Sequence, residues 1–525
     1  MSPHPPIAES LWNTVPPEAQ AALLEVFGSL ERRIAELEKT IAELQVRLNL
    51  NSTNSSKPPS TDPPAVKLKR RPPVPPSGRK RGGQPGHKRH TRALVPPEQL
   101  RETFEVKPTH CQGCGAALQG DDPDPLRHQV AEIPPVRPDV DEYRLHKLTC
   151  SCCGTATRAV LPAGVPTGPF GPRLRAILTM FAGSYRLAKR PIQQLASDLF
   201  GLDISLGMIP KLERRAAETL GPVVAEVVAA IVTAPSAHID ETSWSEANEK
   251  AWLWVGQTDD LTAFTIADNR GADVARSILG TDKAKVVISD RFPSYDWIEQ
   301  HQYCWSHLRR DFQAMIDRHD EGSAVGSDLL GSSDRLFHWW HKYRDGEMAW
   351  STFLGYARPI RWGVRQALER GASCPSEKTA ATCRSLLDGE DHLWTFLRVR
   401  GIEPTNNAAE RALRHAVLWR KSSGGTASEW GSRFVERVLS VVATCRQQGR
   451  NVLEFLTQCF QAGVFCISPR KGIFQALPGR DRRCGGRLAE VAVHARLGET
   501  VVAHERLDQC PVLTAVPQFE ALLAG

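Results

Sequence analysis

The sequence predicts a multidomain protein in which helical and cysteine-containing segments precede an α/β core. The chain has 525 residues, more than a single hydrophobic core usually organises. Residues 23–48 repeat apolar side chains at helical spacing. After Pro235 the pattern changes to short β-rich runs separated by turns.

The first segment is a heptad stripe. Its apolar positions step by four and three residues from Leu23 to Leu48, which is the spacing of a coiled-coil seam. Neither Gly nor Pro interrupts residues 29–50. We expect residues 1–50 to form a helix that pairs with another copy of the chain, because the stripe is narrow and no similar helix lies nearby. The alternative is one amphipathic helix packed on its own chain.

A linker and a basic segment follow. Residues 51–76 are mainly Asn, Ser and Pro, a composition too poor in apolar residues to fold. From Lys57 to Arg92 the chain has eleven Lys or Arg and one acidic residue, Asp62. We interpret this segment as an arm that binds phosphates, although a solvated tail has the same composition. The expected contacts are Arg79, Lys80, Arg81, Lys88 and Arg89.

Two cysteine pairs predict a zinc-binding element in residues 101–165. Cys111 pairs with Cys114 and Cys150 with Cys153, in two Cys-x-x-Cys-Gly strings. Thiolates on two such tight turns complete a tetrahedral Zn²⁺ site. The gap between the pairs exceeds the usual zinc-ribbon spacing, so two unrelated pairs are the alternative, and Cys152 is a substitute ligand.

The expected compartment is the cytoplasm. The N-terminus lacks the apolar run and cleavage site of a signal peptide. No stretch approaches the ~20 apolar residues of a membrane span. The thirteen cysteines are therefore expected to be reduced thiols or metal ligands.

Residues 166–232 are expected to be helical. Residues 192–200 predict a short helix, Gly201 begins a turn, and residues 206–220 predict a second helix. This order is typical of a helix-turn-helix, which places its second helix in the major groove of DNA. Many helical hairpins share the pattern without binding DNA.

Strands are expected after Pro235. They cover residues 237–239, 251–256, 262–267 and 285–289, with a helix over residues 273–279 before the fourth. This succession fits an RNase H-like sheet. In that arrangement the first strand ends in Asp240 and the fourth in Asp290, so both carboxylates stand at the rim of the sheet, where a metal can reach them.

Glu410 is the third candidate acid. Asn406 and Asn407 can cap a helix, and two alanines keep its first turn slim. Glu410 would emerge with Leu413 and Val417 toward the sheet. A lone acid is usually a solvated charge, but three acids, each in a suitable element, indicate a shared centre.

Other residues lie near these acids in the sequence. His307, in the string Cys304-x-x-His307, either supports the active site or is a structural histidine. Arg411 and Arg414 flank Glu410 and either contact backbone phosphates or form a solvated face. Residues 311–400 are interpreted as a helical insertion whose five tryptophans lie mostly in a core, although one could stack on an extruded base.

Several strings together resemble the transposases of the insertion sequence 66 family. The resemblance covers roughly residues 33–460 and includes NSSKPPS, RKRGGQPGH, the four cysteines, HIDETSW, VVISDRFPSYDW, CWSHLRRDF and NNAAERALR, in that order. By matching positions, it implies that Asp240, Asp290 and Glu410 are the catalytic acids. The chain departs from the family at Thr405, where many relatives carry Asp, and in the Arg-rich tail after residue 460.

The resemblance implies a DNA transposase that binds element ends and catalyses cleavage and strand transfer with Mg²⁺ or Mn²⁺. Two cations about 4 Å apart would activate the attacking water and stabilise the leaving 3′ oxygen. The implied partners are element-end DNA and target DNA. The expected partners also include further copies of the chain, joined through the coiled coil, and helper proteins of the same element.

The predicted parts are 1–50 (coiled coil), 51–100 (linker and DNA-binding arm), 101–165 (zinc-binding), 166–232 (helix-turn-helix-like), 233–460 (RNase H-like catalytic domain) and 461–525 (a tail without an assigned function). Two alternatives stay open. A catalytically inactive, zinc-containing DNA-binding regulator would bind element ends without cleaving them. An RNase H-like nuclease would cleave DNA without strand transfer.

Overall fold

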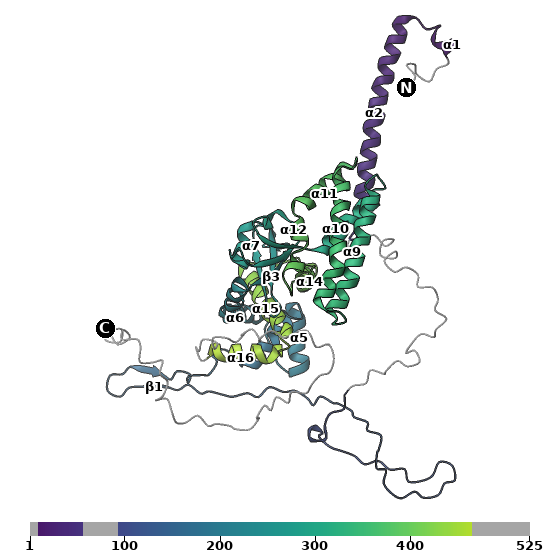
Figure 1. Cartoon of the computed structure of the whole chain (residues 1–525). Coiled ribbons are helices and arrows are strands. Elements are labelled where there is room, and N and C mark those ends of the chain that lie inside the picture. Colours follow the sequence, from purple (N-terminus) through teal and green to yellow (C-terminus); the bar gives the residue numbers. More distant parts are fainter. Residues whose placement is uncertain (1–8, 56–92, 465–525) are drawn as a thin grey trace. The chain divides into compact units, whose positions relative to one another are not determined.

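A computed structural model describes residues 9–55 and 93–464 (Figure 1). The described part begins with α1 (Glu9–Trp12) and α2 (Pro17–Asn49). The short strands β1 (Lys147–Thr149) and β2 (Ala156–Arg158) come before the central core, which starts at α4 (Pro172–Ala182). The predicted contacts of the basic arm, Arg79, Lys80, Arg81, Lys88 and Arg89, lie outside the described residues, as does the tail from residue 465.

A five-stranded mixed sheet forms the centre of the core. Its strands are β3 (Ser236–Glu246), β4 (Glu249–Gln257), β5 (Thr262–Ala267), β6 (Val286–Ser289) and β7 (Gln300–Tyr303), in the order β5-β4-β3-β6-β7. The first three are antiparallel neighbours, whereas β6 and β7 run parallel to β3. Helix α7 (Ala272–Leu279) precedes β6. The predicted α/β class of the core is confirmed.

The first strand is longer than the sequence pattern suggested. Its predicted end at Asp240 is wrong, because β3 continues to Glu246 and Asp240 lies within it. Ala247 and Asn248, with φ of 50° and 66°, form the two-residue turn into β4. β6 pairs with β3 only over residues 236–238, so Asp240 lies beyond the end of the parallel pairing.

The two faces of the sheet pack against different helices. On one face, Ile239 and Trp254 share a hydrophobic core with α6 (Met208–Thr233) and α7. On the other face, Trp244 and Leu253 pack with α14 (Asn407–Ser423). Since side chains alternate between the faces of a strand, odd-numbered positions of β3 face α6 and even-numbered positions face α14.

Helix α15 (Glu429–Gln447) closes the outer edge of the sheet at β5. The backbone N–H groups of Thr262, Phe264 and Ile266 donate to side-chain oxygens of α15. These acceptors, Thr444, Ser440 and Glu436, are all buried and stand four residues apart on one helical face. These side chains accept hydrogen bonds from backbone N–H groups of β5 that would otherwise be free to pair with another strand.

The helices before the sheet share its core. α5 (Lys189–Phe200) ends at Gly201, whose φ is 62°, and α6 follows from Met208. The second helix was predicted over residues 206–220, but α6 continues to Thr233, and Val227 and Ile231 belong to the same core cluster as Ile239. The two predicted parts on either side of residue 233 therefore share one hydrophobic core. Helix α16 (Val452–Val464) packs against α4.

One helix in the described ranges, α6, is long and apolar enough to cross a membrane by length and composition alone. Ten of its side chains are buried in the protein, Ile209 and Ile231 among them. An apolar helix at the centre of a protein core passes the same test, so α6 alone is weak evidence of a membrane span.

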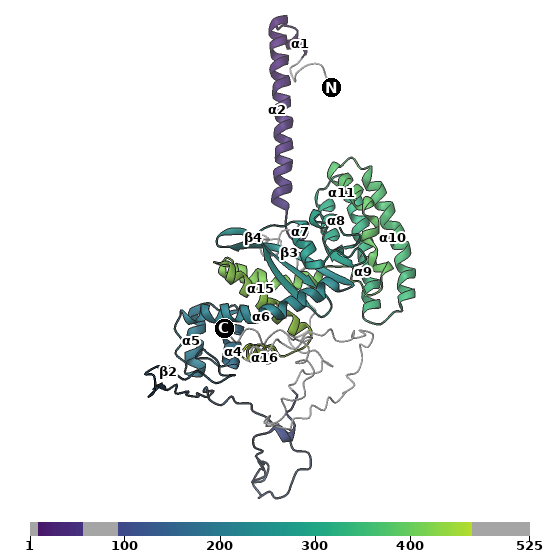
Figure 2. The same cartoon turned by 90° about the vertical axis from the view of Figure 1, so that its left-hand side faces the viewer.

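A helical insertion separates β7 from α14. It consists of α8 (Trp305–Asp317), α9 (Ser323–Arg344), α10 (Trp350–Ala372), α11 (Glu377–Asp388), α12 (Glu390–Leu393) and α13 (Thr395–Arg398). Figure 2 shows its four longer helices, α8 to α11, grouped together. Of its predicted tryptophans, Trp340 and Trp394 are buried in a separate core, and Trp339 and Trp350 pack partly against it. Trp362 is 67% exposed.

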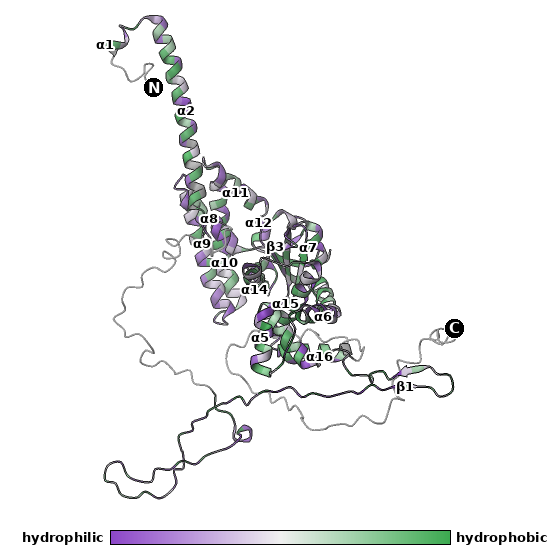
Figure 3. Cartoon of the chain, turned by 180° about the vertical axis from the view of Figure 1, so that it is seen from behind, coloured by the Kyte–Doolittle hydropathy of each residue, from purple (hydrophilic) through white to green (hydrophobic). Residues whose placement is uncertain are grey.

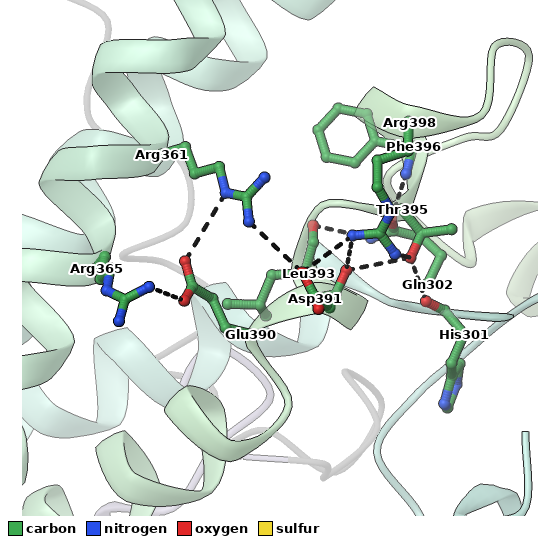
Figure 4. A network of polar contacts seen from close by, with 10 residues as sticks. All are labelled: His301, Gln302, Arg361, Arg365, Glu390, Asp391, Leu393, Thr395, Phe396 and Arg398. Atoms are coloured by element: carbon green, nitrogen blue, oxygen red, sulfur yellow. Dashed lines mark hydrogen bonds and ion pairs between the residues drawn. The ribbon is translucent and has the colours of Figure 1, made fainter. Parts of the chain in front are cut away.

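Polar contacts attach this insertion to the sheet (Figure 4). The Thr395 hydroxyl donates to the carbonyl of His301 at 2.6 Å, and the backbone N–H of Phe396 donates to Gln302 Oε1 at 2.8 Å. Glu390 forms ion pairs with two arginines of α10. Helices α12 and α13 therefore connect α10 to β7.

The heptad stripe lies on the single helix α2. Leu30, Ile34, Leu37 and Ile41 are each at least half exposed. Figure 3 shows hydrophobic and hydrophilic residues alternating along this helix. The stripe therefore presents a continuous apolar face in the single chain.

Candidate active site and metal-binding residues

Strand register brings Asp240 and Asp290 to the same end of the sheet. In the parallel pair of β3 and β6, His238 lies opposite Ile288. Two residues further along each segment are Asp240 and Asp290. Asp290 directly follows the last residue of β6. Asp240 shares its strand face with His238 and Trp244, which is the face covered by α14.

Glu410 approaches this end of the sheet from the first turn of α14. Ala409, Leu413 and Ala416 form the buried stripe of the helix, and the small alanines allow close packing on β3 and β4. The sequence assigned Val417 to this stripe, but Val417 is half-buried and Ala416 takes the inner position. Glu410 is half-buried beside the stripe.

The three carboxylates affect one another electrostatically. Burial is the main cause that raises the pKa of each. The pKa of Asp240 is raised well above its usual range, with further contributions from Glu241, Asp290 and Glu410. Asp290 also raises the pKa of Glu410. Negative charge is therefore concentrated at this end of the sheet.

Neighbouring donors compensate this charge only in part. The backbone N–H groups of Glu241 and Phe292 donate to Asp240 Oδ1 and Asp290 Oδ1, each at 3.0 Å. Arg310 Nη2 lies 3.6 Å from Glu410 Oε1, an oxygen that is buried without a hydrogen-bond partner. Hard divalent cations prefer carboxylate oxygens, so the site suits a cation.

Glu241 belongs to the opposite face of β3. It is buried and accepts hydrogen bonds from Arg270 Nε at 2.6 Å and from the Tyr295 hydroxyl. The Arg270 guanidinium also lies 3.4 Å from the centre of the Phe292 ring. Glu241 is thus a partnered structural acid, although it directly follows Asp240 in the sequence.

Asn406 connects α14 to β3 and was missed as a supporting residue. The sequence suggested a capping role, but no side-chain cap is formed although Asn406 occupies the N-cap position. Its Nδ2 instead donates to the carbonyl of Ile239 at 2.7 Å, and its Oδ1 lies 3.0 Å from His238 Nδ1. The backbone N–H of Glu410 donates to the Asn406 carbonyl at 3.2 Å. Asn406 therefore fixes the start of the helix that carries Glu410.

His307 lies beside Glu410. Its Nδ1 is 3.7 Å from Glu410 Oε1, and burial, with help from Arg310 and Arg291, lowers the pKa of His307 to about 4. Burial raises the pKa of the neighbouring Cys304 thiol to about 11. Among the described residues, the one group of three His, Cys, Asp or Glu side chains with ligand atoms all within 4.8 Å is Cys304, His307 and Glu410.

A cluster of cationic side chains surrounds the outer face of α14. Arg186 Nη1 lies 3.3 Å from His415 Nδ1. Burial lowers the pKa of His415, and so does the charge of Arg446, Arg186 and Arg414. Arg411 and Arg414 are exposed on the same helix. Three separate segments of the chain therefore contribute positive charge to one surface.

The two cysteine pairs adopt matching turns. The N–H of Gly115 donates to the Cys111 carbonyl and that of Gly154 to the Cys150 carbonyl, both at 2.9 Å. Both glycines have positive φ, 74° and 72°, which explains why Gly follows each pair. Backbone N–H groups of the turn and Cys114 lower the pKa of Cys111. In the part of the chain that the structure describes, the four sulfur atoms do not form one close group.

Comparison with known proteins matches residues 168–433 to the Transposase IS66 family. This match spans the sheet, the insertion and the three acids, and covers half of the chain. The chain belongs to the IS66 transposase family. The resemblance inferred from the sequence is confirmed. Residues 4–93 match a family of unknown function (DUF6444).

Two relatives come from Sinorhizobium fredii (strain NBRC 101917 / NGR234). The uncharacterized protein y4qI is 25% identical over 402 residues, which cover 69% of this chain and 72% of y4qI. The uncharacterized protein y4hP is 25% identical over 399 residues, which cover 68% of this chain and 71% of y4hP. Membership of the IS66 family implies a transposase that processes DNA with divalent metal ions.

Proposed function

We propose that the chain is a DNA transposase whose RNase H-like core cleaves element ends and joins them to target DNA. Asp240, Asp290 and Glu410 are the proposed metal ligands. The observation that carries this proposal is the convergence of three carboxylates from β3, the end of β6 and α14, in which Asp290 and Glu410 both raise the pKa of Asp240. The strand order β5-β4-β3-β6-β7 supports the RNase H-like assignment.

The residues present fit two Mg²⁺ or Mn²⁺ ions. Three acids with raised pKa values and a buried Glu410 Oε1 that lacks a hydrogen-bond partner leave negative charge that cations would neutralise. When bound, such ions supply an activated water and stabilise the charge on the leaving 3′ oxygen. The three carboxylates need not form one tight group, because the two ions of such centres stand about 3.5–4 Å apart.

The chain's own residues would hold these ligands in place. Asn406 ties the start of α14 to Ile239, the residue before Asp240. Backbone N–H groups orient Asp240 and Asp290 by donating to one oxygen of each. Each acid therefore keeps a second oxygen for a metal ion.

DNA binding is proposed for two surfaces. The arginines around His415, which are Arg186, Arg414 and Arg446, suit phosphate oxygens, because their charge raises the local positive potential. Arg411 extends this surface toward Glu410 on the same helix. The basic arm of residues 57–92 is the second surface, with Arg79, Lys80, Arg81, Lys88 and Arg89 as its proposed contacts.

Other parts of the chain have proposed structural roles. Cys111, Cys114, Cys150 and Cys153 are proposed to bind one structural Zn²⁺, because both pairs already form the required turns. The exposed stripe of α2 is proposed to pair with α2 of another copy. Helper proteins of the same element remain proposed partners.

The test uses purified protein, labelled element-end DNA and Mg²⁺. Asp240→Asn, Asp290→Asn and Glu410→Gln should each abolish cleavage and strand transfer, because an amide keeps the shape and removes the anionic ligand. Binding of the end DNA should persist in a mobility-shift assay. A matched control is Asp296→Asn, because Asp296 is exposed and should leave activity within a few-fold.

Each outcome distinguishes a different function. Binding without cleavage by the wild-type protein would indicate the DNA-binding regulator. Cleavage without joined products would indicate the nuclease. If Asp296→Asn is inactive while any of the three named variants remains active, the assignment of the metal ligands is wrong. Glu241→Gln is a poor control, because Glu241 is buried against Arg270 and Tyr295.

A further inference from the structure

Cys304, His307 and Glu410 form a cluster that the three-acid centre does not explain. His307 Nδ1 and Glu410 Oε1 are both buried without a hydrogen-bond partner, although they face each other at 3.7 Å. The Cys304 sulfur belongs to the same group, with all ligand atoms within 4.8 Å. Buried polar atoms are normally partnered, and a shared cation would satisfy both of these.

The spacing suits a tetrahedral metal ion. Zinc bonds of about 2.0–2.3 Å at tetrahedral angles place neighbouring ligand atoms about 3.3–3.6 Å apart. The His307–Glu410 separation of 3.7 Å is already close to this range. The Cys304 sulfur lies within 4.8 Å of the His307 and Glu410 ligand atoms. Side-chain movements of up to about 1 Å would bring the three ligand atoms to the spacing of a zinc site.

The surroundings of the sulfur also suit a bound metal. Cys304 is the N-cap residue of α8, and the backbone N–H of Asn406 donates to its Sγ at 3.1 Å. Hydrogen bonds to ligand atoms are the usual second layer of a metal site, because they orient the ligand and tune its charge. Cys304 and His307 stand three residues apart at the start of α8, so both side chains reach the same side of the helix.

We propose that Cys304, His307 and Glu410 bind a thiophilic divalent cation, with Zn²⁺ as the expected ion. This site is distinct from the pair Asp240 and Asp290 but shares Glu410 with it. An ion bound to the sulfur, the imidazole and Glu410 withdraws that carboxylate from the catalytic centre. Zinc at this site therefore inhibits cleavage, a consequence that rests on the proposed function, whereas zinc binding itself does not.

Arg310 competes for the same carboxylate. Its Nη2 lies 3.6 Å from Glu410 Oε1, and its positive charge opposes a cation bound there. Arg310→Gln removes this charge while retaining much of the side-chain length. The variant should therefore bind zinc at this site more tightly than the wild type.

The first experiment counts zinc. Full-length protein is dialysed against buffered excess Zn²⁺, passed through a desalting column and analysed by atomic emission. Cys304→Ser and Glu410→Gln should each hold one zinc per chain fewer than the wild type. Cys374→Ser, a matched control in the loop after α10, should hold the wild-type number, as should Asp240→Asn.

Three results would contradict the site. An unchanged zinc count in Cys304→Ser would exclude Cys304 as a ligand. A loss of one zinc in Asp240→Asn would indicate that the ion binds at the three-acid centre instead. Unchanged or weaker zinc binding by Arg310→Gln would contradict the role of Glu410 as a ligand. Circular dichroism of Cys304→Ser checks that this variant is folded.

The second experiment measures inhibition. At fixed Mg²⁺, added Zn²⁺ should inhibit cleavage of element-end DNA by the wild type, and Cys304→Ser should require at least tenfold more zinc for half inhibition. Equal sensitivity of the two proteins would overturn the inhibitory role. If the wild type does not cleave DNA at all, the proposed function fails while the zinc count still decides whether the site exists.

Discussion

Asn406 offers a direct test of how the site is held together. Its side chain is fully buried and makes two contacts with β3, to the Ile239 carbonyl at 2.7 Å and to His238 Nδ1 at 3.0 Å. Because Nδ2 donates to the carbonyl, Oδ1 must be the acceptor, and His238 therefore carries its proton on Nδ1. Burial lowers the pKa of His238, in agreement with a neutral ring.

Asn406→Ala would leave the carbonyl of Ile239 and the N–H of His238 without these partners. A buried polar group that loses its partner costs about 1–3 kcal/mol, so the two together predict a loss of about 2–6 kcal/mol in the free energy of unfolding. Cleavage should fall as well, because α14 loses its attachment beside Asp240. Asn406→Asp should be intermediate, since it retains the acceptor for His238 and loses the donor to Ile239.

Urea denaturation followed by tryptophan fluorescence measures the loss. Asn407→Ala is the matched control, because Asn407 is half-buried and accepts one hydrogen bond, from the Ser306 hydroxyl at 3.1 Å. It should cost less than about 1 kcal/mol. If Asn406→Ala is no more destabilising than Asn407→Ala, the proposed attachment of α14 to β3 is refuted.

Three further predictions concern other parts of the chain. Burial raises the pKa of Glu436 to about 7, so the folded state binds the carboxyl proton more strongly than the unfolded state and loses stability as pH rises from about 4.5 to 7. Glu436→Gln should therefore reduce the difference in unfolding free energy between pH 5 and pH 8 by on the order of 2–3 kcal/mol. An unchanged difference would exclude Glu436 as its source. Aspartate at both Ile34 and Ile41 should give smaller species by light scattering, because charge in a paired seam is unfavourable; an unchanged mass means that α2 does not pair through this stripe. Cys150→Ser should remove one zinc per chain and weaken DNA binding without changing the melting temperature of the sheet-containing core. An unchanged zinc content in metal analysis would exclude Cys150 as a ligand.

Much of the core could be predicted from residue patterns. The run at residues 262–267 matches β5 without adjustment, and α7 differs from its predicted start by one residue. The end of β3 could not be predicted, because an Asp after an apolar run looks like a strand end. The turn at Ala247 and Asn248 lacks the glycine that usually marks such hairpins.

The division of the chain was harder to predict than its elements. Helix α6 begins as the second helix of a hairpin and ends as a central core helix, through Val227 and Ile231. A sequence pattern shows which side of a helix is apolar and not which element will cover it. The contacts of Thr444, Ser440 and Glu436 with β5 were missed for a related reason, since buried polar residues on a helix look like an exposed face until the edge strand is placed.

The candidate acids could be named from the sequence, but the choice between adjacent residues needed the structure. Asp240 and Glu241 are neighbours with similar chemistry. Strand alternation places them on opposite faces, one toward α14 and the other against Arg270 and Tyr295. Only the face of β3 that meets α14 can bring an acid toward Glu410.

The insertion between β7 and α14 explains why the third acid lies so far along the chain and still reaches the first. Thr395 and Phe396 bind the backbone and side chains of β7 at the end of the insertion, and the N–H of Trp305 at its beginning donates to the carbonyl of Pro404 at 3.0 Å. Its two ends are therefore fixed next to each other. Asn406, two residues after Pro404, then contacts both Cys304 and Ile239. One short segment thus sets the position of Glu410 relative to the sheet and to Cys304, so a change there should disturb catalysis and zinc binding together.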